Sequence, residues 1–135
     1  MSAALLTACA TVPPAAEYPK LPSRALDHPE LTRIGRAVEA LAKAHPGNSG
    51  FRLFASGSDA FTLRVQMADR AERTLDVQYF IFKDDDTGQL LMSAILRAAS
   101  RGVRVRILMD DSEARGQDDR VGALAGNPNV ELEPR

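Results

Sequence analysis

The chain has 135 residues, of which 44% are hydrophobic and 26% charged, a balance that predicts one globular domain with a tail. Its formal net charge of −1 lacks the basic excess typical of nucleic-acid-binding proteins. The absence of Trp, with only five Phe and two Tyr, argues against platforms for base stacking. The sequence contains no run of about 18 apolar residues, which is the length that a helix needs to span a bilayer. Composition excludes these classes and leaves the function open.

The single cysteine, Cys9, excludes an intrachain disulfide. Residues 6–8 (Leu-Thr-Ala) and Ala10 around it resemble a bacterial lipobox, in which a signal peptidase cuts before the cysteine and the thiol then carries a diacylglyceryl group. The alternative is an unmodified cysteine, because the preceding segment has no Lys or Arg and is short for a signal peptide. We interpret residues 1–9 as a lipoprotein signal remnant. This predicts lipid anchoring in the bacterial cell envelope, and Ala10 favours the outer membrane.

An extended tether and a helix are predicted next. Residues 10–29 hold five of the eight prolines and few large apolar side chains, which is typical of an extended linker. The segment from Pro29 to His45 is predicted as a helix, with Asp27 as its cap, because apolar residues recur there at helical spacing. These apolar residues are Leu31, Ile34, Val38 and Leu41.

Strands and helices alternate from residue 51 onward. Four strands are predicted, at residues 51–54, 74–82, 103–109 and 129–133. The segments between them predict helices over residues 56–72, from Asp86 to Gly102, and over residues 118–125. This alternation indicates an α/β fold within residues 30–135, with a parallel or mixed sheet of about four strands flanked by helices.

Two of these elements have a clear pattern of burial. The helix that begins at Asp86 should bury one stripe, formed by Leu90, Leu91, Ala94, Ile95 and Ala98. In the strand at 103–109, Arg104 and Arg106 alternate with aliphatic residues. This alternation predicts one buried face and one partly wet face rather than a phosphate clamp.

Residues 84–88 (Asp-Asp-Asp-Thr-Gly) follow the strand at 74–82 and allow two interpretations. Clustered carboxylates suit Mg²⁺, and a similar arrangement occurs in phosphatases of the haloacid dehalogenase type. Their Asp-x-Asp-Gly order is interrupted here. The favoured interpretation is a loop in which Asp86 caps the following helix. Asp110 and Asp111 end the next strand, where they could line a cleft or lie in a solvated turn.

The two histidines lack the context of a catalytic motif. His28 precedes Pro-Glu and His45 precedes Pro-Gly, so neither begins a His-x-Lys-x4-Asp sequence. We interpret His28 as a solvated tether residue and His45 as a cation at a helix C-terminus.

Residues 51–135 resemble the opening of the phospholipase D superfamily, and within it the bacterial cardiolipin synthase-like lipoproteins. The sequences LDVQYFIF, DDDTG and RGVRVRILMDD occur in this order and at a specific spacing. The segments that carry the resemblance are residues 51–53, 71–82, 84–88 and 98–111.

The resemblance implies phosphatidyl transfer through a covalent phosphohistidine, without a metal or other cofactor. In that family two His-x-Lys-x4-Asp motifs act on a phospholipid at the membrane surface, and neither motif is present in this chain. We therefore expect residues 30–135 to be the incomplete N-terminal part of such a domain, which needs its C-terminal half. No catalytic residue can be assigned. The resemblance also implies that Gln78, Tyr79 and Asp110 border the cleft, because the strand with Gln78 and Tyr79 and the end of the strand before Asp110 lie beside the cleft in the family's sheet.

The leading prediction is an N-terminal fragment of a phosphatidyltransferase that is inactive alone and has no nucleic-acid partner. Two alternatives remain. One is a non-catalytic, membrane-anchored lipoprotein scaffold. The other is a Mg²⁺-dependent phosphatase that uses the Asp84 cluster.

Overall fold

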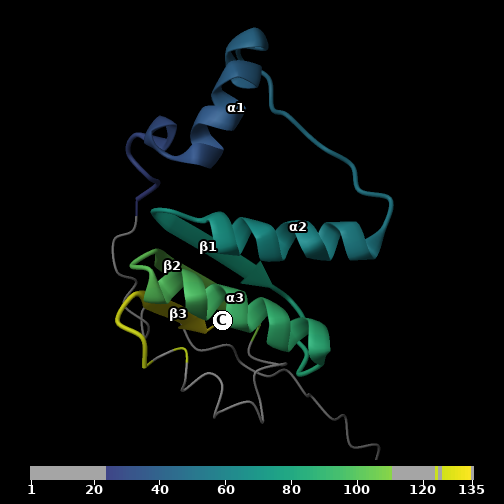
Figure 1. Ribbon diagram of the computed structural model, residues 1–135, viewed down its shortest axis with the longest axis vertical. Coiled ribbons are helices and arrows are strands. Elements are labelled where there is room, and N and C mark those ends of the chain that lie inside the picture. Colours follow the sequence, from purple (N-terminus) through teal and green to yellow (C-terminus); the bar gives the residue numbers. More distant parts are fainter. Residues whose placement is uncertain (1–23, 111–123, 125, 135) are drawn as a thin grey trace, which may run out of the picture.

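The computed structural model describes residues 24–110, 124 and 126–134. Two helices cover one face of a small sheet, and a third helix stands apart from them (Figure 1). In chain order, the elements are η2 (Pro29–Leu31), α1 (Arg33–Ala44), α2 (Gly57–Arg70), β1 (Thr74–Tyr79), α3 (Asp86–Ser100), β2 (Arg104–Met109) and β3 (Val130–Pro134).

The three strands form a wholly parallel sheet in the order β1-β2-β3. In the register, Val77 pairs with Ile107 and Ile107 with Leu132, so aliphatic residues of all three strands line one face. Parallel strands require crossover connections, and α3 provides the one between β1 and β2. The prediction of an α/β fold with a parallel sheet is confirmed in this part of the chain.

The core lies between this sheet face and the two helices α2 and α3. Ile95 of α3 and Val105 and Ile107 of β2 are almost fully buried, and Phe61 and Val65 of α2 pack against the same cluster. The buried stripe of α3 consists of Leu91, Ala94, Ile95, Ala98 and Ala99. The small alanines allow α3 to approach its neighbours closely. Leu90 was wrongly placed in this stripe, because it lies on the solvent side of α3 with 57% of its surface exposed.

The other face of the sheet is polar. Arg106 of β2 donates two hydrogen bonds to Asp76 of β1, Nε to Oδ1 and Nη2 to Oδ2, both at 2.6 Å. Nη2 of Arg104 on the same face donates to the carbonyl oxygen of Arg24 at 3.1 Å. Val105 between these arginines points into the core, which confirms the predicted alternation of a buried and a partly wet face.

The prediction of four strands is wrong at residues 51–54. This segment runs without a strand partner between α1 and α2, and Phe51 and Leu53 are 94% and 95% exposed. A strand forms only where a neighbouring backbone pairs with it, and no described strand lies against this segment. The strand predicted at 74–82 also ends earlier, at Tyr79.

The helix caps differ from the prediction by a few residues. The first helix begins at Arg33, after the short η2, and its N-cap is Thr32, whose hydroxyl accepts a hydrogen bond from the Gly35 N–H at 2.9 Å. Asp27 is therefore not its cap. The N-cap of α3 is Asp85 rather than Asp86, since Oδ1 of Asp85 accepts from the Gly88 N–H at 2.8 Å.

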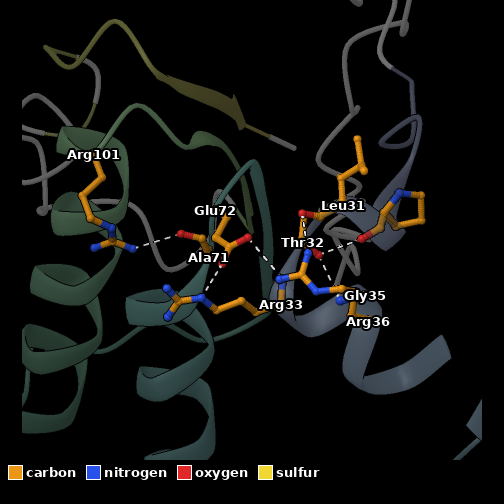
Figure 2. A network of polar contacts seen from close by, with 9 residues as sticks. Leu31, Thr32, Arg33, Gly35, Arg36, Ala71, Glu72 and Arg101 are labelled. Carbon is orange, nitrogen blue, oxygen red and sulfur yellow. Dashed lines mark hydrogen bonds and ion pairs between the residues drawn. The ribbon is translucent and has the colours of Figure 1, made fainter. Parts of the chain in front are cut away.

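Polar contacts join the helix ends to one another (Figure 2). Arg101, at the end of α3, donates from Nη2 to the carbonyl oxygens of Ala68 and Ala71, which close α2. Glu72, next in the chain, pairs with Arg33 of α1 at 3.3 Å. The start of α1 is thereby attached to the connection between α2 and β1.

Several predictions fall outside the described residues. These are the signal remnant with Cys9, the tether up to residue 23, and the helix at 118–125 apart from Leu124. In the part of the chain that is described, no helix is both long enough and apolar enough to cross a bilayer.

The ion pair between Asp76 and Arg106 gives a pH-dependent prediction. The hydrogen bonds from Arg106 hold the pKa of Asp76 below its ordinary value of 3.8; desolvation opposes this shift, and the charges of Arg106 and Arg104 add to it. Because the folded-state pKa is the lower one, the stabilisation is complete well above pH 3.8 and is lost as the pH falls through the folded-state value. We expect Asp76→Asn to lower the free energy of unfolding at neutral pH by about 0.5–1 kcal/mol, a small value because the carboxylate is partly solvated.

The measurement is urea unfolding at neutral pH and at about pH 3, where the difference between parent and variant should shrink. In an Arg106→Gln background Asp76→Asn should have little effect. An equal loss of stability in both backgrounds would show that the pair contributes no coupling energy.

The cap of α3 gives a second prediction. Asp85→Ala should lower the midpoint of thermal unfolding, because the first N–H groups of α3 lose their acceptor. Asp85→Ser, which keeps a capping oxygen, should restore most of the loss, and Asp84→Ala should have a smaller effect. Circular dichroism measures all three, and equal midpoints for Asp85→Ala and Asp84→Ala would contradict the assignment.

Candidate functional site

The carboxyl ends of β1 and β2 form one edge of the sheet. Tyr79 and Met109 are register partners at the last positions of these strands, and the half-buried Asp110 follows directly. In open α/β sheets, ligand sites gather at this edge because loops diverge there and leave a crevice. The structure therefore places Tyr79 and Asp110 at the ends of adjacent strands.

Gln78 and Tyr79 lie on opposite faces of the sheet. Tyr79 pairs with Met109 on the side of the helices, whereas Gln78 pairs with Leu108 on the polar side. Gln78 is exposed and Tyr79 half-buried. Both residues can still be reached from the open side of β1, because β1 is an outer strand of the described sheet.

Tyr79 is held by an aromatic contact. Its ring meets that of Phe82 edge to face, with the centroids 5.3 Å apart and an interplanar angle of 86°. Phe82 is 7% exposed and belongs to the core. The chain after β1 folds back onto the start of α3 so closely that a Cβ at Gly88 would overlap the carbonyl oxygen of Lys83. The contact between the Tyr79 and Phe82 rings positions the tyrosine ring at the carboxyl end of β1.

A mostly apolar groove of about 300 Å³ runs beside β1. It lies between α2, β1 and α3, and both Gln78 and Tyr79 contribute to its wall. The remaining lining residues are Arg64, Met67, Ala68, Leu75, Asp76, Val77, Leu91 and Ile95. The groove combines aliphatic walls with one basic and one acidic residue, Arg64 and Asp76, and can take an apolar chain.

The acidic run at residues 84–86 serves the start of α3. Oδ1 of Asp85 accepts from the Thr87 hydroxyl at 2.6 Å and from the Gly88 N–H, and these bonds lower its pKa. Asp84 accepts a hydrogen bond from the side chain of Gln89 at 3.1 Å. Among the described residues, no group of three His, Cys, Asp or Glu side chains is arranged to hold a metal ion. The interpretation of this run as a capping loop is confirmed, with Asp85 as the capping residue.

The two histidines are distant in sequence from Tyr79 and Asp110 at the carboxyl ends of β1 and β2. His28 is exposed, contacts Glu30 at 3.0 Å and precedes η2 with a left-handed φ of 67°. His45 is the C-cap of α1, as expected. The sites assigned to Cys9 and Asp111 fall outside the described residues.

The sequence analysis missed the pairing of Asp76 with Arg106 and the participation of α2 in the groove. A signal for the pair was present, since both residues lie at polar positions of alternating strands. Their register, however, depends on how the strands align. Arg64 and Met67 gave no signal, because they are ordinary residues on a helix surface.

Comparison with known proteins bears on this arrangement. Residues 65–131 match the family model of the PLD-like domain of cardiolipin synthase. This match begins within α2, includes β1, α3 and β2, and ends in β3. It therefore contains the strand edge with Tyr79 and Asp110.

Individual relatives agree with the family model. Cardiolipin synthase C of Escherichia coli is 46% identical over 102 residues, which are 76% of this chain and 22% of that protein. An uncharacterized protein of Helicobacter pylori is 33% identical over 104 residues, covering 77% of this chain and 21% of its own length. A cardiolipin synthase of Oceanobacillus iheyensis is 29% identical over 68 residues, covering 50% and 14%.

Among solved structures, the archaeal chromatin protein TrmBL2 matches with a TM-score of 0.48 and 16% identity, over 75% of this chain and 40% of that one. A likeness this weak has no bearing on fold or function. The chain spans about a fifth of the length of the first two relatives. The family model and the cardiolipin synthases agree on one assignment: the chain belongs to the phospholipase D superfamily and is cardiolipin synthase-like.

Proposed function

We propose that this chain is the N-terminal part of a phosphatidyltransferase that acts on phospholipid phosphodiesters, and that it is inactive alone. The observation that carries the proposal is the 46% identity to cardiolipin synthase C over three quarters of the chain. The sequence supports inactivity of the chain alone, because neither His28 nor His45 begins a His-x-Lys-x4-Asp motif. The attacking and protonating histidines would come from a segment beyond this one.

The geometry supports a role for the described residues in bordering the lipid site. Tyr79 and Asp110 lie at the carboxyl ends of neighbouring parallel strands, and the groove beside Tyr79 has aliphatic walls. A phospholipid has an anionic phosphodiester and two apolar chains. We infer that the strand edge contacts the head-group region and that Gln78, Tyr79 and Asp110 line that part of the cleft.

A chimera tests this proposal. Residues 65–131 would replace the matching segment of E. coli cardiolipin synthase C, and cardiolipin formation from labelled phosphatidylglycerol would be measured. We expect the chimera to be active and the 135-residue chain alone to form no product. Tyr79→Phe and Asp110→Asn, which change polar atoms with little change in shape, should each lower the rate of the chimera at least about tenfold.

Gln66→Ala provides the matched control for these variants. Gln66 is exposed on α2, inside the exchanged segment, and its replacement should leave the rate unchanged. Turnover of phospholipid by the 135-residue chain would contradict the proposal. An active chimera that is insensitive to both cleft variants would contradict the assignment of Tyr79 and Asp110.

Membrane anchoring through Cys9 belongs to the same proposal. The lipobox-like residues 6–10 support a diacylglyceryl-modified cysteine and a location in the bacterial cell envelope, with the outer membrane favoured. Labelled palmitate should be incorporated into the chain in a bacterial host, and Cys9→Ser should abolish the labelling. Labelling that persists in Cys9→Ser would exclude this anchor.

The two alternatives have less support. A Mg²⁺-dependent phosphatase would use the Asp84 cluster to hold the metal ion. Asp84 accepts a hydrogen bond from Gln89, and among the described residues no three His, Cys, Asp or Glu side chains are arranged to hold a metal. A non-catalytic scaffold agrees with the missing motifs. It predicts that the chimera is inactive although correctly folded.

A further inference from the structure

In the described sheet, the outer side of β1 presents backbone groups that no strand pairs with. The Arg104 N–H donates to the carbonyl oxygen of Arg73 at 3.0 Å, and in a parallel ladder every second residue points its N–H and C=O groups at the same neighbour. The backbone groups that point away from β2 therefore belong to Thr74, Asp76 and Gln78. Among the described strands β1 pairs with β2 alone, so its outer edge is open.

The other outer strand, β3, is a poorer acceptor for a further strand. The Val105 N–H donates to the carbonyl oxygen of Asn129, so every second residue from Val130 onward points its backbone groups away from β2. The Val130 N–H is already bonded to the carbonyl oxygen of Asn127 at 3.0 Å, and Pro134 has no N–H. Outer strands are commonly blocked against pairing in such ways, and β1 lacks these devices.

A groove follows the open edge of β1. The cavity of about 300 Å³ beside β1 meets a second cavity of about 340 Å³, since Met67, Leu75 and Asp76 line both. Helix α2 contributes to the wall of both cavities, and η2 with the start of α1 contributes to the second. The ion pair between Arg33 and Glu72 attaches the start of α1 beside β1 (Figure 2). A groove with unpaired backbone groups along one side and apolar side chains on its walls suits an extended peptide segment.

The walls of the groove favour a single extended segment over a second copy of the chain. A second copy would bring its own β1 flanked by the same α2 and α1, so the helices of the two copies would meet over the shared edge. Residues 10–23 of the chain are unsuited, because four of them are prolines without an N–H for the ladder. Cardiolipin synthase C, by contrast, has most of its length outside the matched segment, which is 22% of that protein.

We propose that one strand from the C-terminal remainder of the domain adds to the outer side of β1. Its backbone pairs with that of Thr74, Asp76 and Gln78, and its side chains alternate between apolar ones that pack against α2 and polar ones on the side of Asp76. This inference rests on the proposed function, since it takes the chain as the N-terminal part of a larger domain. It names the surface through which the two parts join, and it is measured without turnover.

Amide hydrogen exchange in the 135-residue chain and in the chimera with cardiolipin synthase C tests the proposal. In the 135-residue chain, followed by NMR, the N–H groups of Thr74, Asp76 and Gln78 should exchange rapidly, whereas that of Val77, which points to β2, should exchange slowly. In the chimera, mass spectrometry of peptides that cover residues 74–79 should show about three further protected amides. Peptides from α3 provide the control, and their exchange at short times should be the same in both proteins.

Proline substitutions provide a second measurement. Gln78→Pro removes an N–H that points outward, so it should leave the thermal midpoint of the 135-residue chain nearly unchanged. In the chimera the same substitution should lower the midpoint by at least about 3 °C, because a ladder hydrogen bond is lost there. The matched control is Val77→Pro, which removes an N–H that points to β2 and should destabilise both proteins.

Synthetic peptides decide the matter if the chimera does not fold. Overlapping peptides that together cover the remainder of E. coli cardiolipin synthase C would be added to the 135-residue chain. At least one of them should slow the exchange of the Thr74, Asp76 and Gln78 amides at least about tenfold. If no peptide slows their exchange, the proposal is wrong.

Three other results would overturn the proposal. The first is a folded chimera in which the three amides exchange as fast as in the 135-residue chain. The second is protection in the 135-residue chain that increases with its concentration, which would mean that a second copy covers the edge. The third is protection there at every concentration, which would mean that residues 51–54 of the same chain cover it. An inactive chimera with protected amides would contradict the proposed function alone, and an active chimera with unprotected amides would contradict this inference alone.

Discussion

The packing of α3 against β2 is the contact on which the other described elements depend. The stripe of α3 around Ile95 meets Val105 and Ile107, and all three are almost fully buried. Burial of apolar side chains is the main favourable term in folding, and here it is concentrated in one helix and one strand. The strands β1 and β3 add to the two sides of β2, and α2 lies beside α3, where Arg97 pairs with Asp69 at 2.8 Å.

This arrangement also creates the candidate site. Because β2 lies between two parallel strands, the ends of β1 and β2 meet at one edge, and Tyr79 and Asp110 come together although thirty residues separate them. The Phe82 contact fixes the tyrosine through the same core. A change in α3 packing would therefore move the candidate cleft as well as lower stability.

Helix α1 is attached to the rest of the described fold through polar contacts at its first turn. Arg33 pairs with Glu72 and Thr32 caps the helix, whereas Val38 and Leu41 are more than half exposed. An attachment made by polar contacts at one end of the helix buries little apolar surface.

The sequence by itself determined the three helices α1, α2 and α3, the buried strand at 103–109 and the family, since periodicity and a specific run of motifs are local properties. The sequence did not predict the features that depend on contacts between segments distant in the chain. Residues 51–54 have strand-like composition, but a strand also needs a neighbouring backbone. Three consecutive aspartates all suit a cap, and only the backbone geometry selected Asp85. The tertiary structure alone decided that Asp76 meets Arg106 and that Gln78 and Tyr79 face opposite sides of their common edge, because strand register and pleat are set by packing between distant segments.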